Sequence, residues 1–156
     1  MARIEETIDV NVPVSTAYNQ WTQFEEFPRF MEGIDRVQQL DDKHLLWSAE
    51  IGGQKEEWKA EITEQHPDHR VAWKAIEGRE NAGVVTFHRL DENTTRVAVQ
   101  MDWEPDGAVQ SAGAAIGADS RRVKGDLERF KEMIESRGGE TGAWRGEIEN
   151  ETDRSP

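Results

Sequence analysis

Four tryptophans of this chain fall on one face of four separate segments in which apolar and polar residues alternate. They are Trp47, Trp58, Trp73 and Trp103, and each shares its parity with the apolar residues around it. Side chains of a β-strand point alternately to its two faces, so residues two apart share a face. The pattern therefore predicts a sheet with one apolar face that carries the indoles and one face in contact with water.

Turn-forming residues separate the alternating segments at regular intervals. A first strand contains Ile4 and Val10 and ends at Pro13. Six further strands are predicted at 34–40, 44–51, 55–65, 70–77, 83–90 and 94–103. The connections between these six are short, and parallel strands need long crossovers, so an antiparallel sheet is expected.

Helical patterns occupy two other regions. Between the first two strands, one helix is expected with Ser15 as its N-cap, and a second around 25–31 with a kink near Pro28. After residue 107 a long helix reaches about Arg137, with an apolar stripe at Val123, Leu127, Phe130 and Ile134. The predicted fold is α+β: a curved seven-stranded antiparallel sheet wrapped around the C-terminal helix. Residues 1–137 form the domain, and 138–156 are expected to be an acidic, mobile tail.

Composition excludes several classes of function. The chain has 156 residues, enough for one domain, and a net charge of -13. This charge disfavours the basic surface that nucleic-acid binding requires. Cysteine is absent, which excludes disulfides and thiolate chemistry. No signal segment and no apolar run of about 20 residues is found, so a cytoplasmic protein without stable membrane insertion is expected.

Several segments resemble a known family. They are 8–13 leading into the helix at 18–21, the helix at 24–30, the strand at 83–87, the start of the last strand at 95–97, and the glycine-containing C-terminal helix. On these residues, positions 3–137 resemble the polyketide cyclase/dehydrase and lipid-transport family of the START-like (SRPBCC) superfamily. The resemblance implies the helix-grip fold and an internal pocket for a hydrophobic molecule.

The first half of the long helix is built of small residues. Gly113 and Gly117 stand one turn apart on the same side. A glycine inside a helix costs up to about 1 kcal/mol relative to alanine, so a compensating role is expected. Either the glycines pack closely against the indoles, or the two surfaces enclose a pocket, which the width of the indoles favours. The predicted lining is Trp47, Trp58, Trp73, Phe87, Met101, Trp103, Val109, Gly113, Ile116 and Gly117.

Two polar side chains are candidates for the same pocket. Glu6 shares the parity of Ile4 and would therefore point inward as a buried carboxylate. The alternative is a charge near the open end of the strand, where water reaches it. Tyr18 could present its hydroxyl to a ligand or lie in the core with that hydroxyl satisfied. His66 and His69 flank a turn without a supporting ligand cluster, so solvated histidines and no metal site are predicted. No cofactor motif is present.

The predicted function is binding of a hydrophobic small molecule, for sequestration or transport, in an internal cavity. A lipid, an isoprenoid quinone or an aromatic polyketide would suit such a cavity. One alternative is a polyketide aromatase/cyclase-type enzyme with Glu6 and Tyr18 as acid/base groups, although the inward positions are almost entirely apolar. Another is an interaction module with a packed interior, which would bind a protein partner through the acidic tail.

Overall fold

The computed structural model describes residues 2–51, 54–77, 81–103, 112–137 and 139–148, without the side chains of 2, 51, 54, 103 and 112–120. Its seven strands form one antiparallel sheet in the order β1-β7-β6-β5-β4-β3-β2. The strands are β1 (Ala2–Val10), β2 (Ile34–Gln39), β3 (His44–Ile51), β4 (Gln54–His66), β5 (Arg70–Glu77), β6 (Asn81–Asp91) and β7 (Thr94–Trp103). The predicted seven-stranded antiparallel sheet is confirmed.

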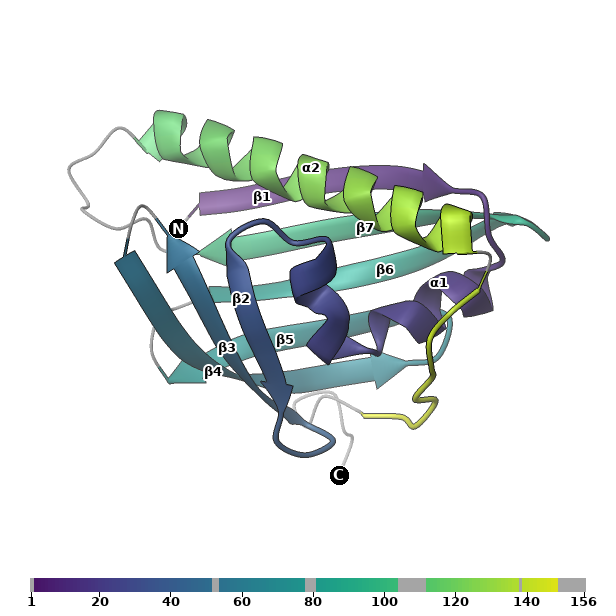
Figure 1. Cartoon of the computed structure of the whole chain (residues 1–156), viewed down its shortest axis with the longest axis horizontal. Helices are drawn as coiled ribbons and strands as arrows, with labels where there is room; N and C mark the ends of the chain where they lie inside the picture. Colours follow the sequence, from purple (N-terminus) through teal and green to yellow (C-terminus); the bar gives the residue numbers. More distant parts are fainter. Residues whose placement is uncertain (1, 52–53, 78–80, 104–111, 138, 149–156) are drawn as a thin grey trace, which may run out of the picture.

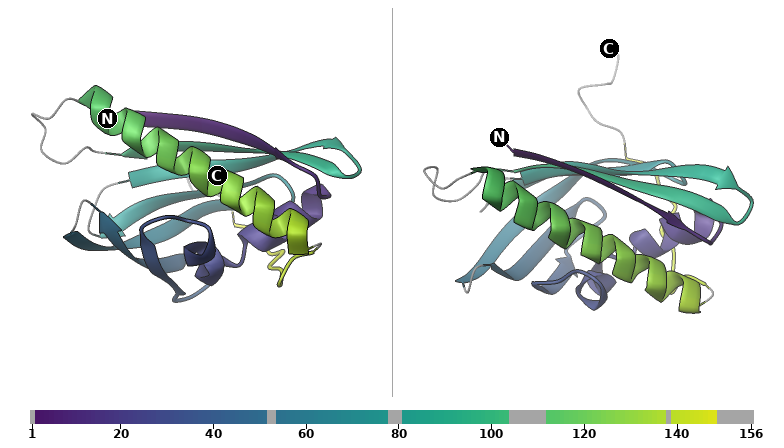
Figure 2. Two further views of the ribbon diagram at one scale, coloured as in Figure 1. Left: turned by 45° about the horizontal axis from the view of Figure 1, so that its top comes forward. Right: turned by 90° about the horizontal axis from the view of Figure 1, so that it is seen from above.

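The sheet curves around helix α2 (Ala112–Arg137), which packs along β1 on the concave side (Figure 1, Figure 2). Within the described ranges, Leu127, Phe130 and Ile134 of the predicted apolar stripe are buried, and Val123 is half-buried. The helix-grip arrangement expected from the sequence is therefore confirmed. No helix in these ranges is long and apolar enough to cross a membrane.

Two short helices connect β1 to β2. Helix α1 (Val14–Trp21) begins after Pro13, which is the N-cap residue and has an extended backbone. No side chain caps this end of the helix. The prediction of Ser15 as the N-cap is therefore wrong. Proline is suited to this position because its ring fixes φ and it has no N–H to satisfy. The second helix, η1 (Phe24–Arg29), is a 3₁₀ helix that contains Pro28.

Trp21 lies at the centre of the packed core. Its ring centroid is 5.2 Å from that of Phe130, 5.3 Å from Phe27 and 5.8 Å from Phe30. These contacts join α1, η1 and α2 in one aromatic cluster. The pair with Phe130 is edge-on and the other two are tilted, and aromatic pairs at such distances each contribute about 0.5–1.5 kcal/mol beyond area burial. The cluster therefore fixes both short helices against the long one.

A bulge in β4 reverses the side-chain alternation near the end of the strand. Ile62 pairs with Trp73 and Gln65 pairs with Val71, so three residues of β4 advance against two of β5. Gln65 consequently enters the core, where its side chain is fully buried and its Nε2 donates to the Tyr18 hydroxyl at 3.0 Å. Simple alternation could not place this amide.

Residues 139–148, here called the C-terminal segment, lie against α1 and β4 (yellow in Figure 1). Ile148 is buried and forms an antiparallel bridge with Gln65, with N···O distances of 2.7 and 2.9 Å. The backbone N–H of Trp144 donates to Thr22 Oγ1 at 3.0 Å. The sequence placed this segment in a tail outside the domain, whereas the structure packs it on the domain because its partners come from α1 and β4.

Candidate functional site

Two indoles stack on the concave face of the sheet, where β3 and β4 run side by side. Trp47 and Trp58 are direct cross-strand partners, and their ring centroids are 5.7 Å apart with planes inclined by 9°. Parallel rings at this separation are offset rather than face to face. Phe27 of η1 contacts Trp47 with a centroid distance of 5.5 Å. Both indoles are only half-buried.

The indole nitrogen of Trp47 is a buried donor for which no acceptor is found among the described residues. An indole N–H can only donate, and a buried donor without an acceptor costs about 1–3 kcal/mol. An acceptor oxygen supplied by a bound molecule would remove this penalty.

A third indole lies across the neighbouring strand. Trp73 pairs with Gly83, and a Cβ on Gly83 would stand 2.6 Å from Trp73 Cζ2. The ring therefore rests where a side chain of β6 would otherwise be. Its Nε1 donates to Asn81 Oδ1 at 3.1 Å, which fixes its orientation. Met101 of β7 is the partner of Gly83 on the other side, so Trp73, Gly83 and Met101 form a continuous strip.

Phe87 belongs to a different part of the same face. It is 4% exposed and contacts Tyr18 edge-on, with a centroid distance of 5.5 Å. Val85 and Val97, on the same face of β6 and β7, are also buried. The concave face thus has a filled half beneath α1 and a half that carries half-buried Trp47, Trp58, Trp73 and Met101.

The other lining residues predicted from the sequence lie at the end of β7 and at or before the start of α2 in the sequence. Val109 lies outside the described residues. Trp103 is the last residue of β7, and Gly113, Ile116 and Gly117 fall in the first half of α2, but their side chains lie outside the description.

Glu6 and Tyr18 occupy different environments. Glu6 pairs with Val99 on the concave face, is half-buried, and has no hydrogen-bond or ion-pair partner in the described part of the chain. Tyr18 is 0% exposed, and burial raises the pKa of its hydroxyl despite the hydrogen bond from Gln65. Arg145 also covers its ring, 5.6 Å from the centroid. Tyr18 is therefore a core residue with its hydroxyl engaged.

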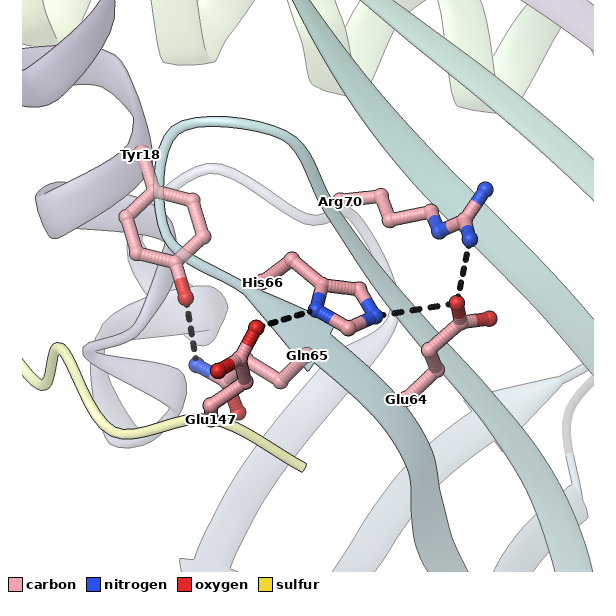
Figure 3. A network of polar contacts seen from close by, with 6 residues as sticks. All are labelled: Tyr18, Glu64, Gln65, His66, Arg70 and Glu147. Carbon is pink, nitrogen blue, oxygen red and sulfur yellow. Dashed lines mark hydrogen bonds and ion pairs between the residues drawn. The ribbon is translucent and has the colours of Figure 1, made fainter. Parts of the chain in front are cut away.

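A second polar cluster lies at the end of β4 (Figure 3). His66 Nδ1 is 2.9 Å from Glu147 Oε1, and His66 Nε2 is 3.0 Å from Glu64 Oε1. Arg70 also pairs with Glu64. The hydrogen bond with Glu147, followed by that with Glu64, raises the pKa of His66. His66 was expected to be solvated, and its carboxylate partners instead come from β4 and the C-terminal segment; no metal-binding group of three side chains occurs in the described ranges.

Sequence reasoning missed two parts of the site. Gly83 was the first residue of the strand predicted at 83–90 and lies inside β6 in the structure, and an isolated glycine within a strand is a signal for a close approach of another group. That signal could have indicated the Trp73 contact. The contact of Phe27 with Trp47 had no local signal, because it depends on how η1 folds back onto β3.

Known proteins similar to this chain agree with the fold. The family described as polyketide cyclase/dehydrase and lipid transport matches residues 10–132. An uncharacterized 17.2 kDa protein from the melC2-rnhH intergenic region of Streptomyces lincolnensis is 54% identical over 149 residues, which are 95% of this chain and 99% of that protein.

Two solved structures show the same fold at low sequence identity. A START superfamily protein from Mycobacterium smegmatis superimposes with a TM-score of 0.78 and 14% identity, over 86% of this chain and 98% of its own. The Zhui aromatase/cyclase from a Streptomyces species gives a TM-score of 0.76 and 14% identity, over 92% of this chain and 99% of its own. The family match over residues 10–132 shows that this chain belongs to the polyketide cyclase/dehydrase and lipid transport family.

Proposed function

We propose that this protein binds a hydrophobic small molecule between the concave face of the sheet and α2. Trp47, Trp58 and Trp73 would form the contact surface, together with Met101 and with Trp103 at the end of β7. Val109, Gly113, Ile116 and Gly117, expected from the sequence, would complete the lining, whereas Phe87 is packed beneath α1 and is left out of it. Sequestration or transport of a lipid, an isoprenoid quinone or an aromatic polyketide is the function that suits such a surface.

The observation that carries the proposal is the contrast between the two halves of the concave face. Beneath α1 the side chains are fully packed, whereas the stacked Trp47 and Trp58 remain half-buried. Covering roughly 200 Å² of apolar ring surface contributes about 5 kcal/mol at about 25 cal/mol/Å². Part of this is offset by the lost freedom of the ligand. Burial of the ligand's own apolar surface adds to the favourable contribution, so the proposed binding does not depend on an ionic contact.

The preformed geometry of the indoles also supports binding. Trp73 is held by Asn81 and Gly83, and Trp47 is held between Trp58 and Phe27. Side chains that are already ordered lose little further entropy when a ligand arrives. The Trp47 N–H is a donor that favours a ligand with an acceptor oxygen.

Native mass spectrometry of the protein purified from its own source tests this proposal, because a bound ligand adds a discrete mass. The Trp58→Ala variant should lose that mass, whereas Trp144→Ala, a change on the C-terminal segment, should retain it. Circular dichroism of both variants checks that they are folded. Loss of the mass from both variants, or from neither, would argue against binding at the indoles.

Glu6 supports a second candidate function, an aromatase/cyclase-type activity. It is a carboxylate on the concave face without a partner in the described residues, and general acid/base catalysis needs such a group within reach of the substrate. In that case Glu6→Gln should abolish turnover of an aromatic polyketide while leaving its binding intact. Equal turnover by Glu6→Gln would exclude Glu6 as the acid/base group, and no turnover by the unmodified protein would leave binding as the function.

A further inference from the structure

We propose that His66 is a pH-sensitive latch that holds the C-terminal segment on the domain while its imidazole is protonated and loosens it when the proton leaves. The proposal is independent of ligand binding on the concave face. It concerns the opposite end of β4, where the segment, the turn after β4 and α1 meet (Figure 3).

The segment is attached to the domain in two places. Its first part is bound by buried polar side chains of α1: Gln20 Oε1 accepts from the N–H of Thr141 at 2.9 Å, and Asn19 Oδ1 accepts from Arg145 at 2.7 Å. Its last part is bound by the bridge between Ile148 and Gln65 and by the contact of Glu147 with His66. The latch acts on this last part.

The bridge occupies a strand edge that β3 does not reach. Pairing between β3 and β4 ends at His44 and Glu61, and Gln65 lies beyond that point. Ile148 supplies the missing hydrogen bonds to the Gln65 backbone. An open strand edge is a site for pairing with another chain, so the segment also protects the sheet.

Protonation of His66 determines how many of its two contacts can exist. Each ring nitrogen lies within 3.0 Å of a carboxylate oxygen, Glu147 at Nδ1 and Glu64 at Nε2. Only the imidazolium can donate from both nitrogens. In one neutral tautomer, Nδ1 has no proton and directs its lone pair at the Glu147 carboxylate. In the other, Nδ1–H still donates to Glu147, but the ring has lost the positive charge that strengthens the bond. Both outcomes weaken the attachment of the segment.

The surrounding charges indicate which of the two His66 contacts is lost first, the one with Glu64 or the one with Glu147. The Glu64 side chain is 14% exposed and also paired with Arg70, whereas the Glu147 side chain is 61% exposed, so water can replace its partner. Asp68 and Arg145 form a neighbouring ion pair at 2.8 Å. Arginine stays protonated throughout the neutral range, so this pair keeps Arg145 on the β4–β5 turn when the latch opens, and the bond to Asn19 keeps it on α1.

Two other polar side chains, of Glu140 and His69, belong to the elements packed around the latch. Glu140 accepts from Asn19 Nδ2 at 2.9 Å, and His69 is exposed in the same turn. Neither contacts His66 by side chain among the described residues. The raised pKa of His66 gives the direction: its contribution is complete below the ordinary histidine pKa of about 6.5 and is lost as the pH rises through the higher pKa of the folded state.

Hydrogen exchange of the full-length protein, read by mass spectrometry as protection factors, tests the latch. Between about pH 6 and about pH 9, amides of the C-terminal segment should lose protection by about two- to fivefold, the size expected for a partly exposed ion pair. His69→Gln should behave like the unmodified protein. His66→Gln and Glu147→Gln should lose the pH dependence, and amides of β6 and β7 should report any global unfolding.

Two results would overturn the latch. One is protection of the segment that does not change with pH in the unmodified protein. The other is an equal change in Glu147→Gln, a substitution at an exposed position that the fold should tolerate even if His66→Gln does not fold. Either result would assign the segment a purely structural attachment.

Discussion

The indole of Trp73 lies against Gly83 on the adjacent strand so closely that no side chain fits between them. A Cβ on Gly83 would stand 2.6 Å from Trp73 Cζ2 and 2.8 Å from the backbone oxygen of Gln100. The backbone oxygen cannot move without disturbing the β6–β7 ladder. The glycine therefore determines where the indole rests on the concave face.

Gly83→Ala should lower the free energy of unfolding by about 1–3 kcal/mol, the usual cost of forcing an extra methyl into a packed site. Chemical denaturation measures the loss, and the fluorescence of the folded state should shift as Trp73 moves. Gly125→Ala is the matched control: the nearest neighbour of its Cβ would be the guanidinium end of the long Arg129 side chain, 3.2 Å away, in the middle of α2. That control should be neutral or stabilising, by up to about 1 kcal/mol. Equal effects of the two substitutions would contradict the proposed role of Gly83.

The hydroxyl of Tyr18 is the acceptor for the buried Gln65 amide. Tyr18→Phe should cost about 1–3 kcal/mol because it leaves that amide donor without a partner. A double-mutant cycle with Gln65→Met, measured by chemical denaturation, should show that the double variant loses less than the sum of the single variants. Strict additivity would mean that the hydrogen bond does not couple the two residues.

The C-terminal segment should contribute to the stability of the whole domain. Removing 138–156 deletes the buried Ile148 side chain and the partners of Asn19, Gln20 and Thr22. Burial of Ile148 alone contributes about 1.5–3 kcal/mol. The truncated chain should therefore unfold at lower denaturant than the full chain, with Ile148→Ala in between. Identical midpoints for the full and truncated chains would show that the segment is a separate tail.

Two aspartates should have pKa values on opposite sides of the ordinary aspartate pKa. The hydrogen bond from Arg96 lowers the pKa of Asp9, whereas burial raises the pKa of Asp126 despite its hydrogen bonds with Glu32 and Arg129. When the pH is lowered, Asp126 should be protonated before Asp9, as followed by carboxyl-carbon NMR.

These pKa shifts determine whether the stability that each aspartate contributes is lost as the pH falls or as it rises. The Asp9 contribution is present above its unfolded pKa and is lost as the pH falls through the folded one. The Asp126 contribution has the opposite sign and is lost as the pH rises through its folded pKa. The reverse order of protonation would contradict the burial of Asp126.

The sequence predicted the order of the strands and helices because the alternation of apolar and polar residues is a local signal. Trp47 and Trp58, for example, share a face as expected and prove to be direct partners. The burial of Gln65 was not predictable, since a bulge depends on how β4 and β5 align. The attachment of Ile148 depends on a contact with a residue far away in the sequence, and the polar residues Asn19 and Gln20 of α1 gave no indication of what would cover them.

In the proposed site, too, the local pattern was predictable and the contacts between distant residues were not. Parity placed Trp47, Trp58, Trp73 and Met101 on the concave face, but it could not separate them from Phe87, which lies beneath α1. That separation depends on tertiary packing. Tyr18 shows the same effect, since only the fold reveals that Gln65 engages its hydroxyl.

The most direct test of ligand binding uses the indole N–H signals of the six tryptophans, followed by NMR while naphthol, a neutral planar aromatic alcohol, is added. We expect saturable shifts for Trp47, Trp58 and Trp73, the largest for Trp47 because its buried N–H has no acceptor among the described residues. Trp21, enclosed in the core, and Trp144, on the C-terminal segment, should not respond. Saturable shifts confined to Trp144, or no saturable shift at Trp47, Trp58 and Trp73, would contradict a binding site on the concave face.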